Sequence, residues 1–405
     1  MTTRFKYWVV SASTCLAVML AVGSVLGQGA DQSDNYKQLG VFSDVVARIK
    51  SDYVEEPDMK SVTLGAMNGL LEAVDPFASY LSADQYKDYL ANKDTQKPDV
   101  GLILSKKFGY MSVVGTVPDS PAAKAGFTMG DIIESLKGIS TRDMPLAYAG
   151  LLLQGAAGSE VDLGVVRVRH PEPQTVKLTR TALAIPPVEG KMLPGQVGYL
   201  DVNALTSVQV GQAAAAIQKL QKDGAQKLVV DLRDCALGSP EEGLAFANLF
   251  IGKGRLIYLK GQRVPQQNID ADPSKVITSL PLAVLINHGT ADGAEVAAAA
   301  LGDNKRAQLV GERTYGDAAL RKAITMDDGG AIILSVAKYY SADGKAIQDA
   351  DVTPAYLVAE PEPQVDVDEN GEPIPETEPQ SQSKKPLLDD PVVKKALEVL
   401  TTAKA

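Results

Sequence analysis

The strongest constraint on the fold is a regular alternation of strand-like and helix-like patterns between residues 188 and 357. Short runs rich in Val, Leu and Ile alternate with longer segments in which apolar residues recur at helical spacing. Strands that are apolar along their whole length are typical of a sheet with helices on both faces. We therefore expect an α/β layer architecture. The expected strands are 197–202, 227–233, 281–286, 308–310 and 331–339, and the expected helices are 210–221, 241–250 and one that starts near Thr290.

A different pattern fills residues 97–183, where short β-rich runs surround two turn motifs. In the segment from Ser120-Pro121 to Gly126, the proline suits the first turn of a short helix and the glycine suits its end. Gly130-Asp131 then predicts a tight turn into a buried strand. These features indicate a separate β-rich domain. Its expected strands are 100–104, 110–114, 161–168 and 175–178.

Helical spacing dominates the region before this domain. Apolar residues recur at that spacing from Leu39 to Ile49 and from Leu64 to Val74. Asp75-Pro76 is expected to end the second helix, because proline disfavours a helical residue before it. The simplest interpretation is a small helical region that packs on its neighbours or dimerises.

Beyond residue 358 the composition changes. Residues 359–388 are rich in Pro, Glu, Asp, Gln and Ser, which bury too little apolar surface to fold alone. We expect an acidic, disordered linker there. In residues 389–405, apolar side chains from Val392 to Leu400 recur at helical spacing, and Pro391 suits a first helical position. The pattern predicts a terminal helix that docks on the core or on a partner.

The first 30 residues predict export. Arg4 and Lys6 precede an uncharged, apolar stretch from Trp8 to about Gln28, as in a signal peptide. About 20 apolar residues also span a bilayer, so an inner-membrane anchor is the alternative. In either case the expected location of the protein is periplasmic or otherwise extracytoplasmic. The net charge of −10 argues against nucleic acid as a partner. Cys235 is the single cysteine after the leader, so no intramolecular disulfide is expected.

Two segments late in the chain resemble the active-site segments of the carboxyl-terminal processing (tail-specific) proteases. They are Asn287-His288-Gly289-Thr290-Ala291-Asp292-Gly293-Ala294-Glu295 and Gly311-Glu312-Arg313-Thr314-Tyr315-Gly316-Asp317-Ala318-Ala319-Leu320-Arg321. The segments 65–70, 75–81 and 339–348 are also similar to that family, so the resemblance covers about residues 36–357. It implies a crotonase-like (Clp-protease-like) α/β core, an inserted PDZ β-sandwich domain and an N-terminal helical region. No cofactor and no metal ion are expected.

The resemblance and the composition together predict the domain boundaries. The expected parts are a signal peptide or membrane anchor (1–30), an N-terminal helical region (31–96), a PDZ domain (97–183), a protease-like α/β core (184–358), the acidic, Pro-rich linker (359–388) and the C-terminal helix (389–405).

In that family a serine, a lysine and a glutamine carry out catalysis, and this chain differs at all three positions. The resemblance pairs the serine with Asp292, the lysine with Asp317 and the glutamine with Arg321. An aspartate has no hydroxyl to act as nucleophile, and a second aspartate has no serine to deprotonate. Arginine is effectively always charged, so Arg321 is expected to form an ion pair with Asp292 or Asp317 that closes the former pocket.

A second difference concerns the oxyanion hole, which in the family involves the backbone of a Gly-Asn-Pro-Gly-Gly segment. Here Arg233 is followed by Asp234-Cys235-Ala236-Leu237-Gly238, so Leu237 and Gly238 are the equivalents in this chain. A side chain at Leu237 and a negative charge at Asp234 both hinder an amide donor aimed at an oxyanion. The sequence therefore predicts the scaffold of a protease without its chemistry.

Other residues near the site have simpler explanations than catalysis. Thr290 is expected to be the N-cap of a helix. His288 is expected to be a solvated loop residue, and Cys235 to be a small, half-buried residue and not a thiol nucleophile. Lys322 lies five residues past the lysine position, and its side chain is expected to point elsewhere on a strand.

Two further interpretations of the acidic residues stay open. If Asp292 and Asp317 lie close together, their like charges raise one pKa, as in an aspartic-protease dyad. Alternatively, Asp292, Asp317 and Glu295 could bridge a divalent cation through oxygen ligands. The ion pair with Arg321 is the favoured interpretation.

The expected PDZ domain carries a second candidate site. PDZ domains add an extended peptide to a sheet edge and hold its terminal carboxylate with backbone amides. The expected carboxylate loop is Val100-Gly101-Leu102-Ile103, where Gly101 lets the backbone approach closely. The first loop glycine of the family is missing, and Asp99 lies near the expected carboxylate position. The alternative role of this domain is to brace the core.

Together these features predict an exported pseudoprotease. Its expected partners are C-terminal peptides of other proteins or an active protease paralogue, which it would regulate or scaffold. A homo- or heterodimer is expected, because members of the family self-associate through their terminal regions. The competing hypothesis is an active serine-type endopeptidase with a rearranged active site.

Overall fold

The computed structural model describes residues 30–93, 97–107, 109–142, 144–167, 170–348, 350–359 and 386–402. Nearly all of the predicted leader and of the predicted linker lies outside these residues. The chain divides into two compact units, Met1–Gly65 and Ala66–Ala405. This division falls inside the region that we expect to be one helical region, and the predicted domain boundaries stay predictions. No helix among the described residues is long and apolar enough to cross a membrane.

The first unit contains helix α2 (Ala30–Asp52) and the beginning of helix α3 (Met59–Glu72). The carboxylate of Asp58 accepts a hydrogen bond from the amide of Lys60 (3.0 Å), which satisfies a donor in the first turn of α3. Helix α3 ends before Asp75-Pro76, as the sequence predicts. Most of the large apolar side chains described in α2 are exposed in the single chain. They include Leu39, Val41, Phe42 and Val45.

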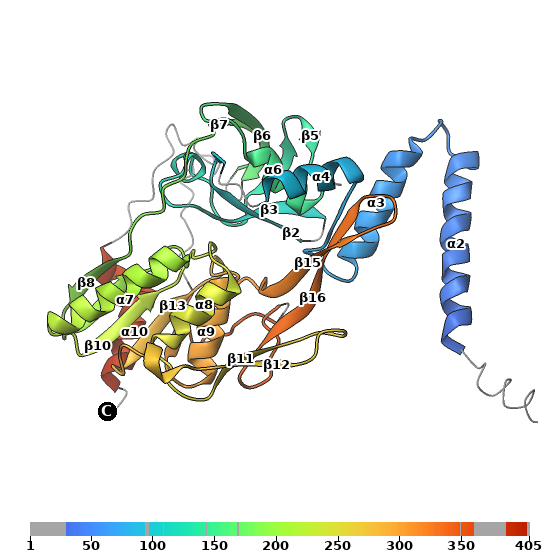
Figure 1. Ribbon diagram of the computed structural model, residues 1–405. Helices are drawn as coiled ribbons and strands as arrows, with labels where there is room; N and C mark the ends of the chain where they lie inside the picture. Colours follow the sequence, from blue (N-terminus) through green and yellow to red (C-terminus); the bar gives the residue numbers. More distant parts are fainter. Residues whose placement is uncertain are drawn as a thin grey trace, which may run out of the picture. The chain divides into compact units, whose positions relative to one another are not determined.

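The expected β-rich domain forms a sheet with the strand order β2-β3-β4-β6-β7, and β5 pairs with β4 (Figure 1). Ser120 caps helix α5 by accepting the amide of Ala123 (3.1 Å), and Pro121 occupies the first turn, as predicted. Among the described strands β2 pairs only with β3, so β2 is an edge strand. The elements are β2 (Leu102–Lys107), β3 (Tyr110–Thr116), α5 (Pro121–Lys124), β4 (Ile132–Leu136), β5 (Ile139–Ser140), α6 (Leu146–Leu153), β6 (Glu160–Arg167) and β7 (His170–Thr179).

The α/β core is built on a six-stranded sheet with the order β17-β14-β13-β10-β9-β8. All of its strand pairs are parallel except β8–β9. The elements are β8 (Glu189–Leu193), β9 (Val197–Asp201), α7 (Ser207–Lys222), β10 (Lys227–Asp231), α8 (Pro240–Asn248), η1 (Pro273–Lys275), β13 (Leu282–Ile286), α9 (Gly293–Asp303), β14 (Gln308–Gly311), β17 (Tyr356–Leu357), η2 (Leu387–Asp389) and α10 (Pro391–Thr402).

Alternate residues of the central strands face two different apolar clusters. Leu228 and Val230 of β10 pack in the cluster that contains residues of α7, α8 and α9. Val229, between them, packs in the cluster that contains Val393 and Ala396 of α10. Both faces of the sheet are therefore covered by helices, which confirms the predicted α/β layer architecture.

The terminal helix α10 docks on the core. Asp390 precedes it and accepts the amide of Val392 (2.8 Å), so the helix begins with a capping carboxylate. The same residue forms an ion pair with Arg233 (2.8 Å), which also binds Asp231 at the end of β10 (2.6 Å). The sequence predicts that this helix docks on the core or on a partner, and in the structure it packs on the core.

A second core sheet was not predicted from the sequence. Its strand order is β1-β16-β11-β12, and β15 pairs with β16 on a branch. The long strand β16 contains the predicted strand 331–339. The remaining strands are short or half-exposed, and helix α4 follows β1. The elements are β1 (Ser79–Leu81), α4 (Ala83–Asn92), β11 (Arg255–Lys260), β12 (Gln267–Asp270), β15 (Ala319–Thr325) and β16 (Ala331–Ser341).

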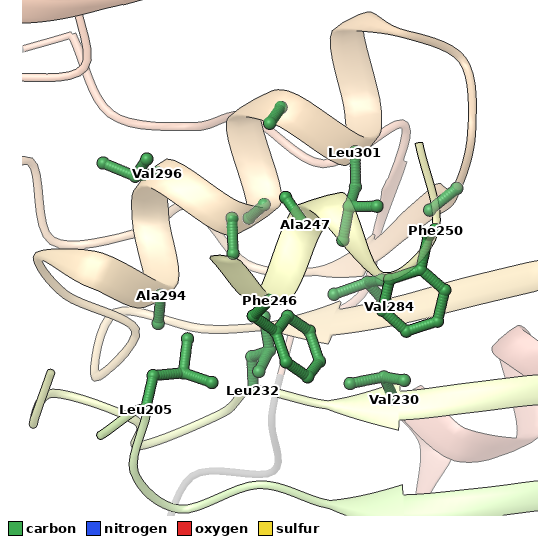
Figure 2. Close-up of a cluster of buried hydrophobic side chains, with 14 of the residues drawn as sticks. Leu205, Val230, Leu232, Phe246, Ala247, Phe250, Val284, Ala294, Val296 and Leu301 are labelled. Atoms are coloured by element: carbon green, nitrogen blue, oxygen red, sulfur yellow. The ribbon is translucent and has the colours of Figure 1, made fainter. Parts of the chain in front are cut away.

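Helices α8 and α9 are packed together by one apolar cluster. Figure 2 shows Phe246 of α8 pointing toward Leu232 and Val230, with Phe250 beside Val284. The rings of Phe246 and Phe250 meet edge to face at 5.4 Å between centroids. At Gly243 the backbones approach so closely that a Cβ would lie 1.9 Å from the carbonyl oxygen of Gly293. This contact fixes the first turn of α9, where the candidate site lies.

Candidate functional site

The first part of the site is a sharp turn between strand β13 and helix α9. Asp292 stands directly before α9 with φ 47° and ψ −112°, a conformation that side chains rarely adopt. Asn287 holds the turn, because its side-chain oxygen accepts the amides of Asp234 and Gly289 (both 3.0 Å). A strained strand-to-helix turn of this kind presents the nucleophile in other hydrolases. This chain has the same kind of backbone turn, but the side chain at its tip is the carboxylate of Asp292.

Asp317 and Arg321 form the second part of the site. Their side chains make an ion pair, and Arg321 Nη2 also donates to the backbone carbonyl of Asp317 (2.7 Å). The guanidinium lies over the ring of Phe77 at 4.7 Å from its centroid. The predicted ion pair of Arg321 is thus confirmed, with Asp317 as its partner.

The charges of these residues act on Asp292, which is half-buried. Burial raises the pKa of Asp292 well above its ordinary value, and the carboxylate of Asp317 raises it further. The guanidinium of Arg321 opposes that rise. The structure therefore brings Asp292, Asp317 and Arg321 into one electrostatic site.

Glu295 joins the two segments. Its side chain is fully buried, and its two oxygens accept four hydrogen bonds. The donors are the hydroxyl of Thr314 (2.5 Å) and the amides of Gly316 (2.5 Å), Asp317 (2.8 Å) and Asp292 (3.1 Å). Burial raises the pKa of Glu295 to about 7, although the hydrogen bonds from Thr314, Asp317 and Gly316 lower it.

The sequence did not predict this role, since the only role expected of Glu295 was that of a possible cation ligand. The signal that could have found part of it is the spacing Asp292-x-x-Glu295, a capping box in which the glutamate reaches back to the amide before the helix. The contacts of Glu295 with Thr314 and Asp317 depend on the tertiary fold. Among the described residues, no group of three or more His, Cys, Asp or Glu side chains is placed to hold a metal ion.

In the loop paired with the oxyanion hole, two backbone carbonyls accept hydrogen bonds. The carbonyl of Leu237 accepts the amide of Leu205 (2.7 Å). The carbonyl of Gly238 accepts the amide of Gly293 (3.2 Å), the residue that follows Asp292. Because an oxyanion hole needs amides that face the reacting oxygen, the hydrogen bond of Gly293 to a carbonyl works against such a role.

Cys235, His288 and Lys322 differ in how far they are buried. Cys235 is fully buried, more than expected, and burial raises the pKa of its thiol, which disfavours a nucleophilic thiolate. His288 is exposed, as expected, and lies 3.9 Å from Glu312. Lys322 is also exposed on β15.

The prediction that Thr290 is an N-cap is wrong. Helix α9 begins at Gly293, after Asp292, and the hydroxyl of Thr290 donates instead to the carbonyl of Leu232 (2.8 Å). The same hydroxyl accepts the amide of Asn287 (3.1 Å). Thr290 therefore fastens the turn to the end of the neighbouring strand β10.

The candidate peptide loop of the PDZ domain leads into β2, whose first two residues are Leu102 and Ile103. Val100 and Leu102 are buried, and Gly101 has φ 82° with no room for a side chain, since a Cβ would lie 2.3 Å from that of Ser120. Ile103 is half-buried and packs in a small apolar cluster with Tyr315 and with Ala291 of the sharp turn. The carboxylate of Asp99 accepts the amide of Gly101 (2.7 Å). An acidic side chain of the chain itself thus occupies the loop.

Comparisons with known proteins agree with this architecture. The sequence model of Peptidase family S41 matches residues 196–358, and a PDZ domain model matches residues 113–167. The chain is 32% identical over 303 residues to the carboxyl-terminal-processing protease of Picosynechococcus sp., covering 72% of each chain. It is 29% identical over 339 residues to the carboxy-terminal-processing protease of Bartonella bacilliformis, covering 82% of this chain and 78% of that one.

A solved structure shows the same fold. The photosystem II D1 C-terminal processing protease superposes with a TM-score of 0.65 at 26% identity, over 78% of this chain and 86% of that chain. An α/β core with an inserted PDZ domain and an N-terminal helical region is thus the fold of a family S41 peptidase. The chain belongs to the carboxyl-terminal processing protease family.

Proposed function

We propose that this chain is an exported pseudoprotease of its family, which binds polypeptides and regulates or scaffolds an active paralogue. The observation that carries the proposal is the site around Asp292. The sharp turn that should present a hydroxyl presents a carboxylate, and the neighbouring position that should hold an amine holds Asp317, paired with Arg321.

This arrangement has no route to serine-type hydrolysis. A serine–lysine dyad needs a hydroxyl and a desolvated amine that takes its proton. Here the side chains of Asp292 and Asp317 are both acids, so neither provides a hydroxyl or an amine, and the charge of Asp317 opposes the negative charge that develops on a substrate carbonyl. Loss of the nucleophile alone costs other serine hydrolases about a millionfold in turnover.

The rest of the family architecture is retained, which favours a binding role. The relatives are named as carboxy-terminal-processing proteases, and proteins of this family act on protein C-terminal peptides. Among the described strands, β2 of the PDZ domain pairs only with β3. Export, membrane anchoring and pairing with a second family member belong to the same proposal. They are supported by the leader pattern and by the exposed apolar side chains of α2.

We expect the purified protein to leave unstructured polypeptides with apolar C-termini intact. The physical reason is the missing hydroxyl and amine at positions 292 and 317. Mass spectrometry of the incubated substrates measures the outcome, with an active family member as the positive control. Cleavage by this chain that disappears in an Asp292→Ala variant would instead establish the competing hypothesis, an endopeptidase with a rearranged site.

The combined variant Asp292→Ser, Asp317→Lys and Arg321→Gln extends this test. Because the turn at residue 292 already has a nucleophile-type backbone, the variant restores the dyad and its glutamine in place. We expect little activity even so, since the amide of Gly293 donates to the carbonyl of Gly238. Activity close to that of the positive control would show that the oxyanion loop is functional and that the three side chains alone abolish catalysis.

A further inference from the structure

The first loop glycine of the family is missing from the PDZ domain, and the structure shows what the acidic residue near the expected carboxylate position does. Asp99 Oδ1 accepts the amide of Gly101 at 2.7 Å. The amides of Val100 and Gly101 both lower the pKa of Asp99, while burial raises it more strongly. A carboxylate held by successive backbone amides is the arrangement by which such loops hold the C-terminus of a ligand.

The loop is fixed in this state from both sides. Asp99 exchanges two backbone hydrogen bonds with Thr181 (2.9 and 3.0 Å). The carbonyl of Val100 accepts the amide of Ala122 (2.9 Å), and the carbonyl of Gly101 accepts the amide of Val117 (2.8 Å). Asp99 therefore cannot leave the amides by a shift of the loop backbone without breaking several hydrogen bonds.

The cation that acts on Asp99 offers no replacement site for a second carboxylate. Arg180 lowers the pKa of Asp99, but its guanidinium donates to the carbonyls of Leu152 (2.7 Å), Leu153 (2.8 Å) and Glu160 (2.8 Å). A ligand carboxylate would therefore have to displace Asp99 and then lie beside its negative charge. Like charges at hydrogen-bond separation repel strongly in a partly buried loop.

The edge of the sheet next to this loop is still suited to peptide addition. Strand β2 pairs only with β3 among the described strands, and helix α6 contacts β2. Leu104 of β2 is half-buried against the apolar cluster that contains Ala149 and Leu153 of α6. Main-chain hydrogen bonds at such an edge need an extended segment, and they do not need a chain end.

We propose that Asp99 takes the place of the ligand's terminal carboxylate, so that this PDZ domain binds internal extended segments of polypeptide and does not select free C-termini. This inference rests on the proposed peptide-binding function and changes its ligand class. The occupant of the β2 edge is a segment within an unfolded or extended stretch of a protein.

Paired peptides test the proposal with the full chain. An array of peptides with random interior positions and an apolar last residue is prepared in two versions, as free acids and as C-terminal amides. Fluorescence polarisation of the strongest binder of each version then gives the ratio of affinities. For the natural chain we expect the amide version to bind at least as tightly as the acid version.

Substitutions at Asp99 give the decisive comparison. Asp99→Asn keeps the side-chain oxygen for the amide of Gly101 and removes the charge, so the acid version should gain about tenfold relative to the amide. Asp99→Gly also vacates the amides, and it should shift the ratio further in the same direction. The matched control Asp162→Asn removes a charge from an exposed site on β6 of the same domain, and the ratio should not change.

Two results would overturn the inference. One is a natural chain that prefers the free acid, and the other is an affinity ratio that Asp99→Gly leaves unchanged. Absence of binding to either version, in the natural chain and in Asp99→Gly alike, would remove peptide binding at this domain altogether. The cleavage assay described above is independent of these measurements, so it decides separately whether the chain is a pseudoprotease.

Discussion

Replacing Glu295 with alanine is expected to lower the free energy of unfolding of the core by about 3–5 kcal/mol at pH 7. The side chain is fully buried, and it accepts the amides of Asp292, Gly316 and Asp317 and the hydroxyl of Thr314. The hydroxyl can turn to another acceptor, but the three amides would stay in place without one. Each buried donor left without an acceptor costs about 1–3 kcal/mol.

Urea unfolding followed by circular dichroism measures this loss, and hydrogen exchange of the amides of α9 locates it. Glu295→Gln keeps the volume and one acceptor, so its loss should be smaller. As a matched control, Glu398→Ala removes an exposed glutamate whose partner is Lys395 at 3.0 Å, and it should change stability by less than about 1 kcal/mol. An alanine variant at 295 as stable as the natural chain would mean that Glu295 does not hold the two segments together.

The α/β core was predictable because its strands are apolar along their whole length. In β13 every residue is buried, so the strand stands out in the sequence between polar segments. Strand β12 and most of strand β15 contain no such apolar run, because most of their residues are exposed. The second sheet was missed for that reason. Strand β15 pairs with β16 and strand β12 pairs with β11, and no local sequence pattern records these contacts.

One contact of the candidate site, the ion pair of Arg321, was predictable because few acidic residues could be its partner. Arg321 had two acidic candidates, and the structure has the ion pair with Asp317. The role of Thr290 was mistaken because a shift of two residues in the helix start changes which side chain can cap it. The role of Glu295 requires that two segments about twenty residues apart meet, as its hydrogen bonds to Thr314 and Asp317 show. Spacing within one segment does not contain that information.

The stability of the core is expected to fall as the pH rises from about 5 to about 8. Glu295 has an ordinary pKa near 4.5 and a folded-state pKa of about 7, so the folded chain holds this proton more tightly than the unfolded chain. The stability that Glu295 contributes is then fully present below pH 4.5 and is lost as the pH rises through 7. A pKa difference of this size between the unfolded and the folded chain corresponds to about 3 kcal/mol in the free energy of unfolding. The raised pKa of Asp292 acts in the same direction.

Replacing Asp292 with asparagine should recover part of this loss. The variant keeps the shape of the side chain, and asparagine tolerates positive φ better than most residues. It removes a carboxylate whose ionisation is opposed by burial and by Asp317, so we expect a gain in stability at pH 8 that is larger than any change at pH 5. The pH profile of urea unfolding should become flatter.

The matched control is an aspartate whose pKa is shifted in the opposite direction, Asp328. The carboxylate of Asp328 accepts a hydrogen bond from the hydroxyl of Tyr80 (2.6 Å), which lowers its pKa, so Asp328→Asn should not raise stability at pH 8. If Asp292→Asn were less stable than the natural chain at pH 8, the carboxylate would be a stabilising partner in the site. The negative charge at the nucleophile position would then contribute to folding. The expected gain would instead mean that the chain retains a buried acid at a cost in stability, as functional sites commonly do.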